Sequence, residues 1–328
     1  MKYLLLSLFL VVMTGCASSI QHDSQLFVID QGRIPPPDIT ISIPGLGPCI
    51  DNSNQPLRLN SQEPVIVLVH GCIGSAGRFR ALAEVFAFSG QQAICFSYND
   101  RDSLMVSSAQ LATTLAKLAG DIKNRKITVI GHSQGGLIAR KALVADITNK
   151  LKGIDVDLKL VTVSSPFSGI EAANHCGSTL GGILSLGLTI PICKIVSGDK
   201  WFEITSASEF IRQPGIFLEQ VGEHLKVNTN ESGSCRRVDS EGECAEKDYV
   251  FSLNEQRHPP VDGWANVKNV EVKAGHVEIV GDNRVVPLKL IAILQKHRIL
   301  NTNAPEQSAV FGQMLTRLYR TEAPPKSH

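Results

Sequence analysis

The sequence has almost no net charge and lacks the motifs that mark nucleotide or metal binding. Its 32 lysines and arginines balance 31 acidic residues, which leaves a formal net charge of +1. This balance argues against nucleic acid as a partner, because nucleic-acid-binding domains carry an excess of basic residues. No phosphate-binding glycine loop, zinc-ligand spacing or internal repeat occurs, and the nine histidines are scattered along the chain. We therefore expect neither a cofactor nor a metal site.

The chain also lacks an apolar run long enough to cross a bilayer, which takes about 20 residues. The apolar stretch Leu4–Met13 follows Lys2 and is far too short. It leads into Thr14-Gly15-Cys16-Ala17, where a cysteine directly after glycine resembles the bacterial lipobox. The resemblance implies that residues 1–15 are a signal peptide and that Cys16 carries several acyl chains, enough for stable anchoring. The alternative is an ordinary cleaved signal in which Cys16 is incidental.

The residues around Cys16 bear on where the protein is anchored. Met13 stands where leucine is commoner in lipoboxes, which is a mild departure. Ala17 is not the aspartate that resembles a signal for retention in the inner membrane, so we expect the outer membrane of a bacterial cell envelope. Residues 16–39 are polar and contain Pro35-Pro36-Pro37, and we expect them to be a tether that holds the domain off the membrane.

Export to an oxidising compartment would permit disulfides. Apart from Cys16 there are seven cysteines, at Cys49, Cys72, Cys95, Cys176, Cys193, Cys235 and Cys244. Cys235 and Cys244 bracket a short polar loop, so we expect them to form a disulfide with little strain. Cys176 and Cys193 bracket a glycine-rich apolar segment, and Cys95 lies in a strand-like run where it can be a buried small hydrophobic residue. Because seven is odd, at least one thiol is expected to be free.

Gly131-His132-Ser133-Gln134-Gly135 is the most informative stretch of the chain. It follows the β-branched apolar run Ile127–Ile130 and precedes the helix-patterned run Gly136–Val144. A strand, a sharp G-x-S-x-G turn and a helix present a serine hydroxyl at the carboxyl edge of a parallel sheet. We therefore expect Ser133 to be a nucleophile. The backbone N–H of Gln134, at the start of the helix, would stabilise an oxyanion.

Two further features lie where a serine hydrolase needs them. The apolar run Val65–Val69 ends in His70-Gly71-Cys72-Ile73-Gly74, where the backbone N–H of Cys72 would be the second oxyanion donor and His70 a structural support. Downstream, Val270-Glu271-Val272 leads into Gly275-His276, so His276 is the expected general base. The nucleophile comes first and the histidine last, as in α/β-hydrolases.

These motifs together resemble those of α/β-hydrolases of the bacterial lipase and esterase kind. His70-Gly71-Cys72-Ile73-Gly74 resembles their H-G-x-x-G motif, and Gly131–Gly136 resembles their G-H-S-x-G-G elbow. Ser164–Gly169 resembles the T-P-H-x-G segment after the sixth strand, with Phe167 where histidine is common, and Ser206–Ile211 loosely resembles the S-x-F-L segment beyond the lid. The resemblance covers residues 60 to 298. It implies cleavage of carboxylic esters through an acyl-enzyme, without a cofactor.

The acid that orients His276 is expected after the seventh strand of this fold. We place that strand at Tyr249–Leu253, so Glu255 directly after it is the favoured acid. The alternative is Asp262, which resembles the D-G-x segment of some lipases but sits on a longer loop. Asp248 and Asp282 are expected to be capping or solvent-exposed charges.

The alternation of apolar strands and amphipathic helices predicts an α/β fold, with a mostly parallel sheet and helices on both faces. The expected strands are Val65–Val69, Ala93–Tyr98, Ile127–Ile130, Leu158–Val163, Tyr249–Leu253 and Val267–Val272, and the expected helices include Ala76–Ser89 and Ala109–Ala119. Residues 40–300 would form the hydrolase domain and residues 301–328 a C-terminal tail. Within the domain, residues 170–227 break the alternation and would form a cap or lid after the sixth strand; a buried helical hairpin is the alternative.

The expected protein is a lipid-anchored lipase or esterase that acts on an ester or lipid substrate. An acyltransferase or a thioesterase would use the same triad, because only the acceptor or the leaving group differs. A lipoprotein that keeps the fold as a non-catalytic scaffold is the alternative from another class. The sequence leaves acyl length, head group, membrane leaflet and oligomeric state open.

Overall fold

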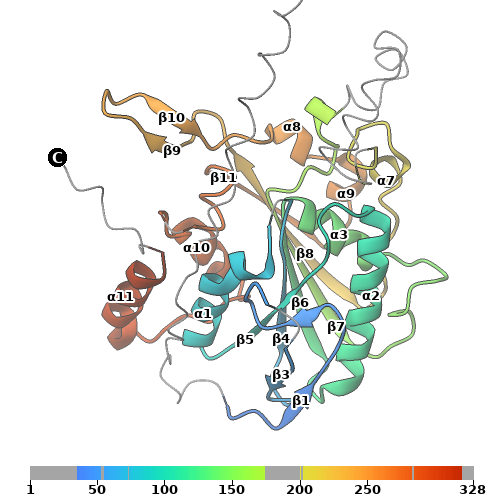
Figure 1. Cartoon of the computed structure of the whole chain (residues 1–328). Helices are drawn as coiled ribbons and strands as arrows, with labels where there is room; N and C mark the ends of the chain where they lie inside the picture. Colours follow the sequence, from blue (N-terminus) through green and yellow to red (C-terminus); the bar gives the residue numbers. More distant parts are fainter. Residues whose placement is uncertain are drawn as a thin grey trace, which may run out of the picture.

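A seven-stranded sheet forms the centre of the computed structural model (Figure 1). The structure describes residues 35–52, 55–72, 74–173, 200, 202–282 and 284–319. Cys16, the expected signal peptide, Cys176 and Cys193 lie outside these residues. In the described residues, no helix is long and apolar enough to cross a membrane.

The strand order of the sheet is β11-β8-β7-β6-β4-β5-β2. The strands are β2 (Leu46–Gly47), β4 (Val65–Val69), β5 (Gln92–Phe96), β6 (Lys126–His132), β7 (Asp157–Val163), β8 (Val221–Asn230) and β11 (Val267–Lys273). All neighbours are parallel except β2, which pairs antiparallel with β5. Val69 pairs with Gly131 and His132 with Val163, so β4, β6 and β7 end at one edge of the sheet.

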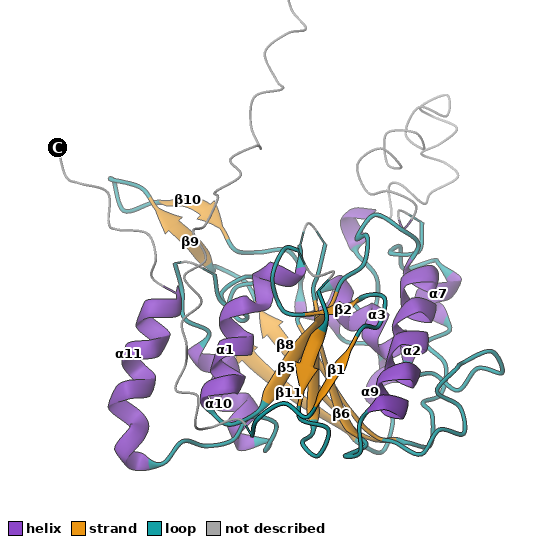
Figure 2. Ribbon diagram, turned by 60° about the horizontal axis from the view of Figure 1, so that its bottom comes forward, coloured by secondary structure: helices purple, strands orange, loops and turns teal. Residues whose placement is uncertain are grey.

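Helices cover both faces of the sheet, as the sequence predicted (Figure 2). The helices are α1 (Arg80–Phe88, after the 3-10 turn Ala76–Phe79), α2 (Leu104–Asp121), α3 (Gln134–Ala142), α7 (Glu209–Arg212), α8 (Leu253–Gln256), α9 (Pro259–Asp262), α10 (Leu288–Lys296) and α11 (Ser308–Tyr319). Buried side chains of α2 and α3 form one apolar core with the sheet, while those of α1, α10 and α11 form a second core on the opposite face. The near-continuous apolar character of strands such as Val65–Val69 follows from burial on both faces.

Two differences from the expected elements concern the end of the sheet. Tyr249–Leu253 is not a strand, because it is irregular until α8 begins at Leu253. The missing strand is β8, which lies between β7 and β11 and takes up the last residues of the segment expected to form a cap. Its apolar side chains, Leu225 and Val227, face one core, and a row of buried polar side chains faces the other.

The C-terminal segment contributes to the core instead of forming a simple tail. Helix α11 lies against α1, where the rings of Phe311 and Phe88 are 5.2 Å apart. Leu315 and Tyr319 of the same helix are buried, with 5% and 2% exposure. Residues 308–319 of the expected tail are therefore part of the folded domain.

Two disulfides lie in the described residues. Cys235 and Cys244 are bonded, as expected, and join β9 (Cys235–Val238) to β10 (Cys244–Lys247) in a projecting hairpin (Figure 1). Cys49 and Cys95 form the other bond, so Cys95 is buried in a strand as expected but is a disulfide partner and not simply a small hydrophobic residue. Cys72 is free and exposed.

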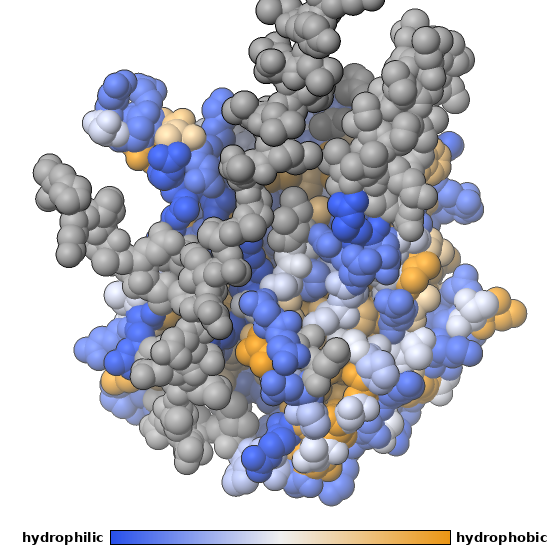
Figure 3. Space-filling view, viewed as in Figure 1, coloured by the Kyte–Doolittle hydropathy of each residue, from blue (hydrophilic) through white to orange (hydrophobic). Residues whose placement is uncertain are grey.

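The remaining described elements are peripheral. β1 (Ile39–Ile41) and β3 (Leu57–Leu59) form a small antiparallel sheet. Short 3-10 turns lie at Glu171–Ala173 and Pro305–Gln307. In the described part of the face seen in Figure 3, hydrophobic side chains are scattered among hydrophilic ones.

Candidate active site

The turn between β6 and α3 places Ser133 in a strained backbone conformation. Ser133 has φ 56° and ψ −127°, a left-handed φ that few residues other than glycine adopt. Its hydroxyl stands where the strand ends and the helix begins, and the residue is 5% exposed. Strain of this kind persists only where the surroundings hold it, and it concentrates at functional sites.

Two glycines allow the loop after β4 to press against this turn. A Cβ atom on Gly135 would lie 2.3 Å from the carbonyl oxygen of His70. A Cβ atom on Gly71 would lie 2.9 Å from the Cβ of Ser133 and 3.5 Å from its Oγ. Larger residues are thus excluded from both positions. Cys72 directly follows Gly71 in this loop. Gln134 is the first residue of α3, where an N–H has no partner within the helix.

His70 stabilises the loop after β4 through contacts with Tyr98. Its ring stacks on Tyr98 with centroids 4.3 Å apart, and the Tyr98 hydroxyl donates to the His70 carbonyl over 2.7 Å. Burial lowers the pKa of His70, so the ring is neutral at pH 7. These contacts agree with the structural role that the sequence assigned to His70.

A set of side-chain hydrogen bonds links Cys72 to Gln134. The Gln134 Nε2 donates to the carbonyl oxygen of Asp100 over 3.2 Å. The Lys200 Nζ donates to the same carbonyl and lies 3.1 Å from the Cys72 Sγ. Lys200 is only 2% exposed. The two residues expected to supply oxyanion donors are thus connected through one lysine and one carbonyl group.

His276 lies in the turn after β11, held by Asp248. The His276 N–H donates to the Asp248 carbonyl over 3.1 Å, and the Asp248 carboxylate accepts from the N–H groups of Val277 and Glu278, each over 2.9 Å. Asp248 is therefore a capping charge, as expected. The His276 carbonyl hydrogen-bonds the His132 Nε2 over 2.9 Å, which ties this turn to the residue before Ser133.

The acid beside His276 is Glu231, directly after β8. Its Oε1 lies 3.0 Å from the His276 Nδ1, and its Oε2 accepts from the N–H groups of Val250 and Phe251 over 2.6 and 2.9 Å. The carboxylate is buried, with 1% exposure of the residue. Burial alone would raise the pKa of Glu231, but hydrogen bonds from His276, Ser164 and Phe251 hold it below its ordinary value. Glu231 is therefore ionised at neutral pH.

Glu255 and Asp262, the two acids expected from the sequence, form other contacts. Glu255 closes a capping box at the start of α8 with Ser252, its N-cap residue. Asp262 forms an ion pair with the buried Lys226, with Nζ and Oδ1 2.6 Å apart. Both expectations depended on the position of one strand. The carboxylate that lies against His276 does directly follow a strand, but that strand is β8 and not Tyr249–Leu253.

Two buried hydroxyl groups, those of Ser164 and Thr229, lie beside the Glu231–His276 pair. The Ser164 Oγ, at the end of β7, lies 2.6 Å from the Glu231 Oε1 and 2.9 Å from the His276 Nδ1. The Thr229 Oγ1 lies 2.8 Å from the Ser164 Oγ. The sequence interpretation missed Glu231, Ser164 and Thr229. The sequence signal for these residues was that they lie at or just after the ends of two neighbouring strands, β7 and β8.

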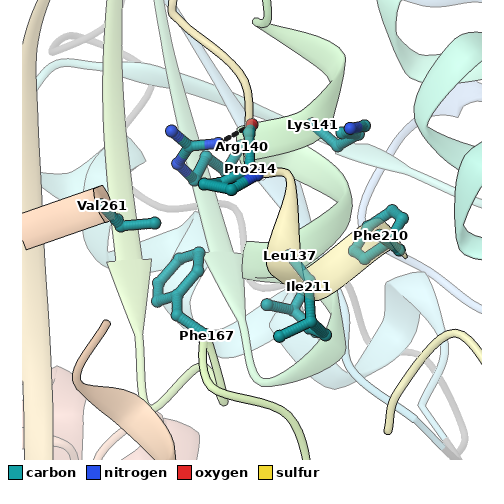
Figure 4. Close-up of a pocket in the computed structure, with 8 residues that line it drawn as sticks. All are labelled: Leu137, Arg140, Lys141, Phe167, Phe210, Ile211, Pro214 and Val261. Atoms are coloured by element: carbon teal, nitrogen blue, oxygen red, sulfur yellow. Dashed lines mark hydrogen bonds between the residues drawn. The ribbon is translucent and has the colours of Figure 1, made fainter. Parts of the chain in front are cut away.

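A cavity beside α3 is lined by a different set of side chains (Figure 4). It holds about 260 Å³ of empty space, including space open to solvent. Its lining residues are Leu137, Arg140, Lys141, Phe167, Phe210, Ile211, Pro214 and Val261. None of these belongs to the Ser133 turn or to the Glu231–His276 pair. In the described part of the chain, no cluster of histidine, cysteine and acidic side chains could hold a metal ion.

The sheet order, the strained serine turn and the paired histidine define the α/β-hydrolase class. Two solved structures share the fold. The mature lipase BlEst2 of Bacillus licheniformis matches with a TM-score of 0.50 and 17% identity, over 72% of this chain and 92% of that one. Its propeptide form matches with a TM-score of 0.52 and 16% identity, over 82% of this chain and 55% of that one. A search of curated proteins found no match.

The family is shown by a match to its model. The model of the palmitoyl protein thioesterase family matches residues 64–229, about half of the chain. The chain belongs to this family and is a hydrolase of the esterase or thioesterase type. The expected resemblance to α/β-hydrolases is confirmed. The matched residues end just before Glu231, so the assignment of Glu231 and His276 to the site is based on their geometry.

Proposed function

We propose that the protein cleaves carboxylic esters through an acyl-enzyme on Ser133, with His276 as general base and Glu231 as the acid that orients it. The observation that carries this proposal is the buried contact between Glu231 Oε1 and His276 Nδ1, which are 3.0 Å apart. An ionised carboxylate at Nδ1 keeps the proton there and leaves Nε2 free to accept another. It also stabilises the imidazolium that forms during attack.

The reaction would proceed in two halves. The Ser133 Oγ bonds to the acyl carbon as its proton moves to the His276 Nε2, and the carbonyl electron pair moves to oxygen. The tetrahedral intermediate collapses, and the alcohol leaves with the proton from His276. Water then attacks the acyl-enzyme by the same route in reverse, which releases the acid and restores Ser133.

The developing oxyanion would be stabilised by the backbone N–H groups of Cys72 and Gln134. Support comes from the close approach of Gly71 to Ser133 and from the position of Gln134 at the start of α3. Each such donor contributes on the order of 3 kcal/mol of transition-state stabilisation in enzymes of this kind. Because the donors are backbone groups, the geometry of the loop matters more than its side chains.

Thioester cleavage is the second candidate, and the family match favours it. The same residues would carry it, with a thiolate in place of an alkoxide as the leaving group. Parallel assays of p-nitrophenyl acyl esters and acyl-coenzyme A thioesters, each with several acyl lengths, would decide between the two substrate classes. A higher kcat/KM for thioesters of equal acyl length would make thioester cleavage the main activity.

The test of the enzyme itself is labelling with a fluorophosphonate probe, which reacts with activated serines. We expect labelling of Ser133 in the wild-type protein and neither labelling nor hydrolysis of either substrate class in Ser133→Ala. A matched control is Ser108→Ala, which removes a buried hydroxyl from α2, where it donates to the Leu104 carbonyl. An unlabelled wild-type protein without activity would instead favour the non-catalytic scaffold.

We also propose that Cys16 is lipidated and anchors the protein in the outer membrane of a bacterial cell. The support is the lipobox-like Met13-Thr14-Gly15-Cys16 and the proline-marked segment before β1. Membrane fractionation of Cys16→Ser tests this directly. The variant should move from the membrane pellet to the soluble envelope fraction, and a variant that stays in the pellet would contradict lipid anchoring.

A further inference from the structure

The hydroxyl of Ser164 lies between the two members of the Glu231–His276 pair. Its Oγ is 2.6 Å from the Glu231 Oε1 and 2.9 Å from the His276 Nδ1, so it contacts the same two atoms that contact each other. Ser164 is completely buried.

The protons in this cluster can be assigned from the donors present. Glu231 is ionised and can only accept, so the short contact with Ser164 requires the serine O–H to donate to Oε1. The Ser164 oxygen then has lone pairs to accept from the His276 Nδ1–H. The Thr229 hydroxyl can donate to the same oxygen over 2.8 Å. The Nδ1–H is thereby shared between a carboxylate and a hydroxyl, which fixes the ring plane as well as the tautomer.

Ser164 has a strained backbone conformation, and the hydrogen bonds of its hydroxyl explain why a serine occupies this position. Its φ is 46°, in the left-handed region where glycine is favoured. Glycine would adopt this conformation more easily but would remove the hydroxyl. A strained residue that persists in a fully buried position points to a use of its side chain.

We propose that Ser164 is a positioning residue that holds the His276 imidazole in its reactive tautomer and orientation through a shared hydrogen bond with Glu231. The inference rests on the proposed function of Ser133 and His276. Ser164 itself touches neither the substrate nor the reacting atoms. Its loss therefore leaves substrate binding intact and slows the proton transfers.

The substitution Ser164→Gly distinguishes the effect of losing the hydroxyl from the effect of straining the backbone. Glycine relieves the strain at φ 46°, which offsets part of the stability lost with the buried hydrogen bonds of the hydroxyl, so the variant should still fold, and its Tm is measured to check this. We expect its kcat to fall about tenfold or more while KM stays within about twofold, because a hydrogen bond to a charged group is lost in the transition state. Ser164→Ala should show the same fall in kcat.

A direct readout is the NMR resonance of the His276 Nδ1 proton. It should move in Ser164→Gly, because one of its two acceptors is lost, although Glu231 remains. The matched control is Arg298→Gly, which relieves a similar left-handed φ of 57° at an exposed position after α10. This control should keep both kcat and the resonance.

The outcomes distinguish the two proposals. A Ser164→Gly variant with unchanged kcat and an unmoved Nδ1 proton resonance would overturn the positioning role while Ser133→Ala is still inactive. An active Ser133→Ala would overturn the proposed function itself. If Ser164→Ala loses kcat but Ser164→Gly does not, the role of residue 164 lies in the backbone and not in the hydroxyl, and the inference fails.

Discussion

Glu231 Oε1 and His276 Nδ1 lie 3.0 Å apart, although 45 positions separate the two residues in the sequence. Each residue follows a strand, and those two strands, β8 and β11, are neighbours in the sheet. The parallel register therefore delivers both side chains to the same edge. The pair owes its geometry to the sheet, and the loops between the strands can vary in length without changing it.

The first prediction concerns which acid acts on His276. Glu231→Gln should lower kcat by about 10³-fold to 10⁴-fold with little change in KM, because an amide cannot stabilise the imidazolium. Glu255→Gln should leave kcat within about twofold and change the Tm little, because glutamine can also close the capping box with Ser252. Steady-state kinetics and thermal melts of both variants measure this. The assignment is wrong if Glu255→Gln shows the larger loss of kcat.

The second prediction concerns the lysine between the two expected oxyanion residues. Lys200→Met removes the hydrogen bonds to Cys72 and to the Asp100 carbonyl, so the loop after β4 should lose its fixed geometry. We expect kcat to fall about tenfold and KM to change little. The preference for an oxoester over the matching thionoester should also shrink, because sulfur fits a well-formed oxyanion hole poorly. Lys268→Met, at an exposed ion pair with Glu223, is the matched control.

Constant selectivity between oxoester and thionoester in Lys200→Met would show that Lys200 plays no part in oxyanion geometry. Lys200→Arg keeps a donor and a charge at this position and should recover part of the lost kcat. A failure of arginine to recover any kcat would indicate that only the compact ammonium fits between the two acceptors.

The third prediction is a loss of stability in mild acid. Burial, with repulsion from His276, lowers the pKa of His132 from 6.5 to about 3. Between pH 6.5 and about 3, the His132 ring is therefore protonated in the unfolded chain but neutral in the folded chain. The contribution of His132 to the free energy of unfolding is fully present above pH 6.5. Below pH 6.5 it falls by up to about 1.4 kcal/mol per pH unit. Urea denaturation at pH 7, 6 and 5 measures the slope.

The matched variant for this prediction is His132→Asn, which removes the titrating group. Its free energy of unfolding should depend less steeply on pH than that of the wild type, whatever the absolute change in stability. Parallel slopes for the two proteins would contradict the contribution of His132.

The fourth prediction tests the C-terminal helix. Leu315→Ala should cost about 2–5 kcal/mol of unfolding free energy, because Leu315 is 5% exposed in the core shared with α1 and α10. Val310→Ala on the same helix, at 53% exposure, should cost less than about 0.5 kcal/mol. Equal effects of the two substitutions on urea midpoints would mean that α11 does not pack as described.

The sequence was most informative where a strand pattern and a turn motif coincide. Val65–Val69 is a strand with the expected bounds, and the turn at Ser133 joins a strand to a helix as the glycines indicated. These elements are buried on both faces, so their apolar runs stand out. The disulfide between Cys235 and Cys244 was predictable because its partners lie close in sequence.

Strand β8 was missed because its two faces differ in character. Leu225 and Val227 alternate with Lys226, which is buried and paired with Asp262. A charged residue on one face makes a core strand resemble a surface segment in sequence, so β8 did not stand out, and its first residues were included in the expected cap, residues 170–227. The Cys49–Cys95 bond joins partners with a sequence separation of 46, and spacing alone does not reveal such a pair.

The position of β11 at the edge of the sheet makes catalysis sensitive to local unfolding. Among the described residues β11 pairs only with β8, and all of its residues are exposed or half-buried. Edge strands open at lower free energy than central ones, while β6, which carries the serine, has neighbours on both sides. On heating, His276, which follows β11, should therefore move away from Glu231 while the rest of the sheet is still folded. Enzymatic activity would decline at a lower temperature than secondary structure, and amide hydrogen exchange would be faster in β11 than in β6.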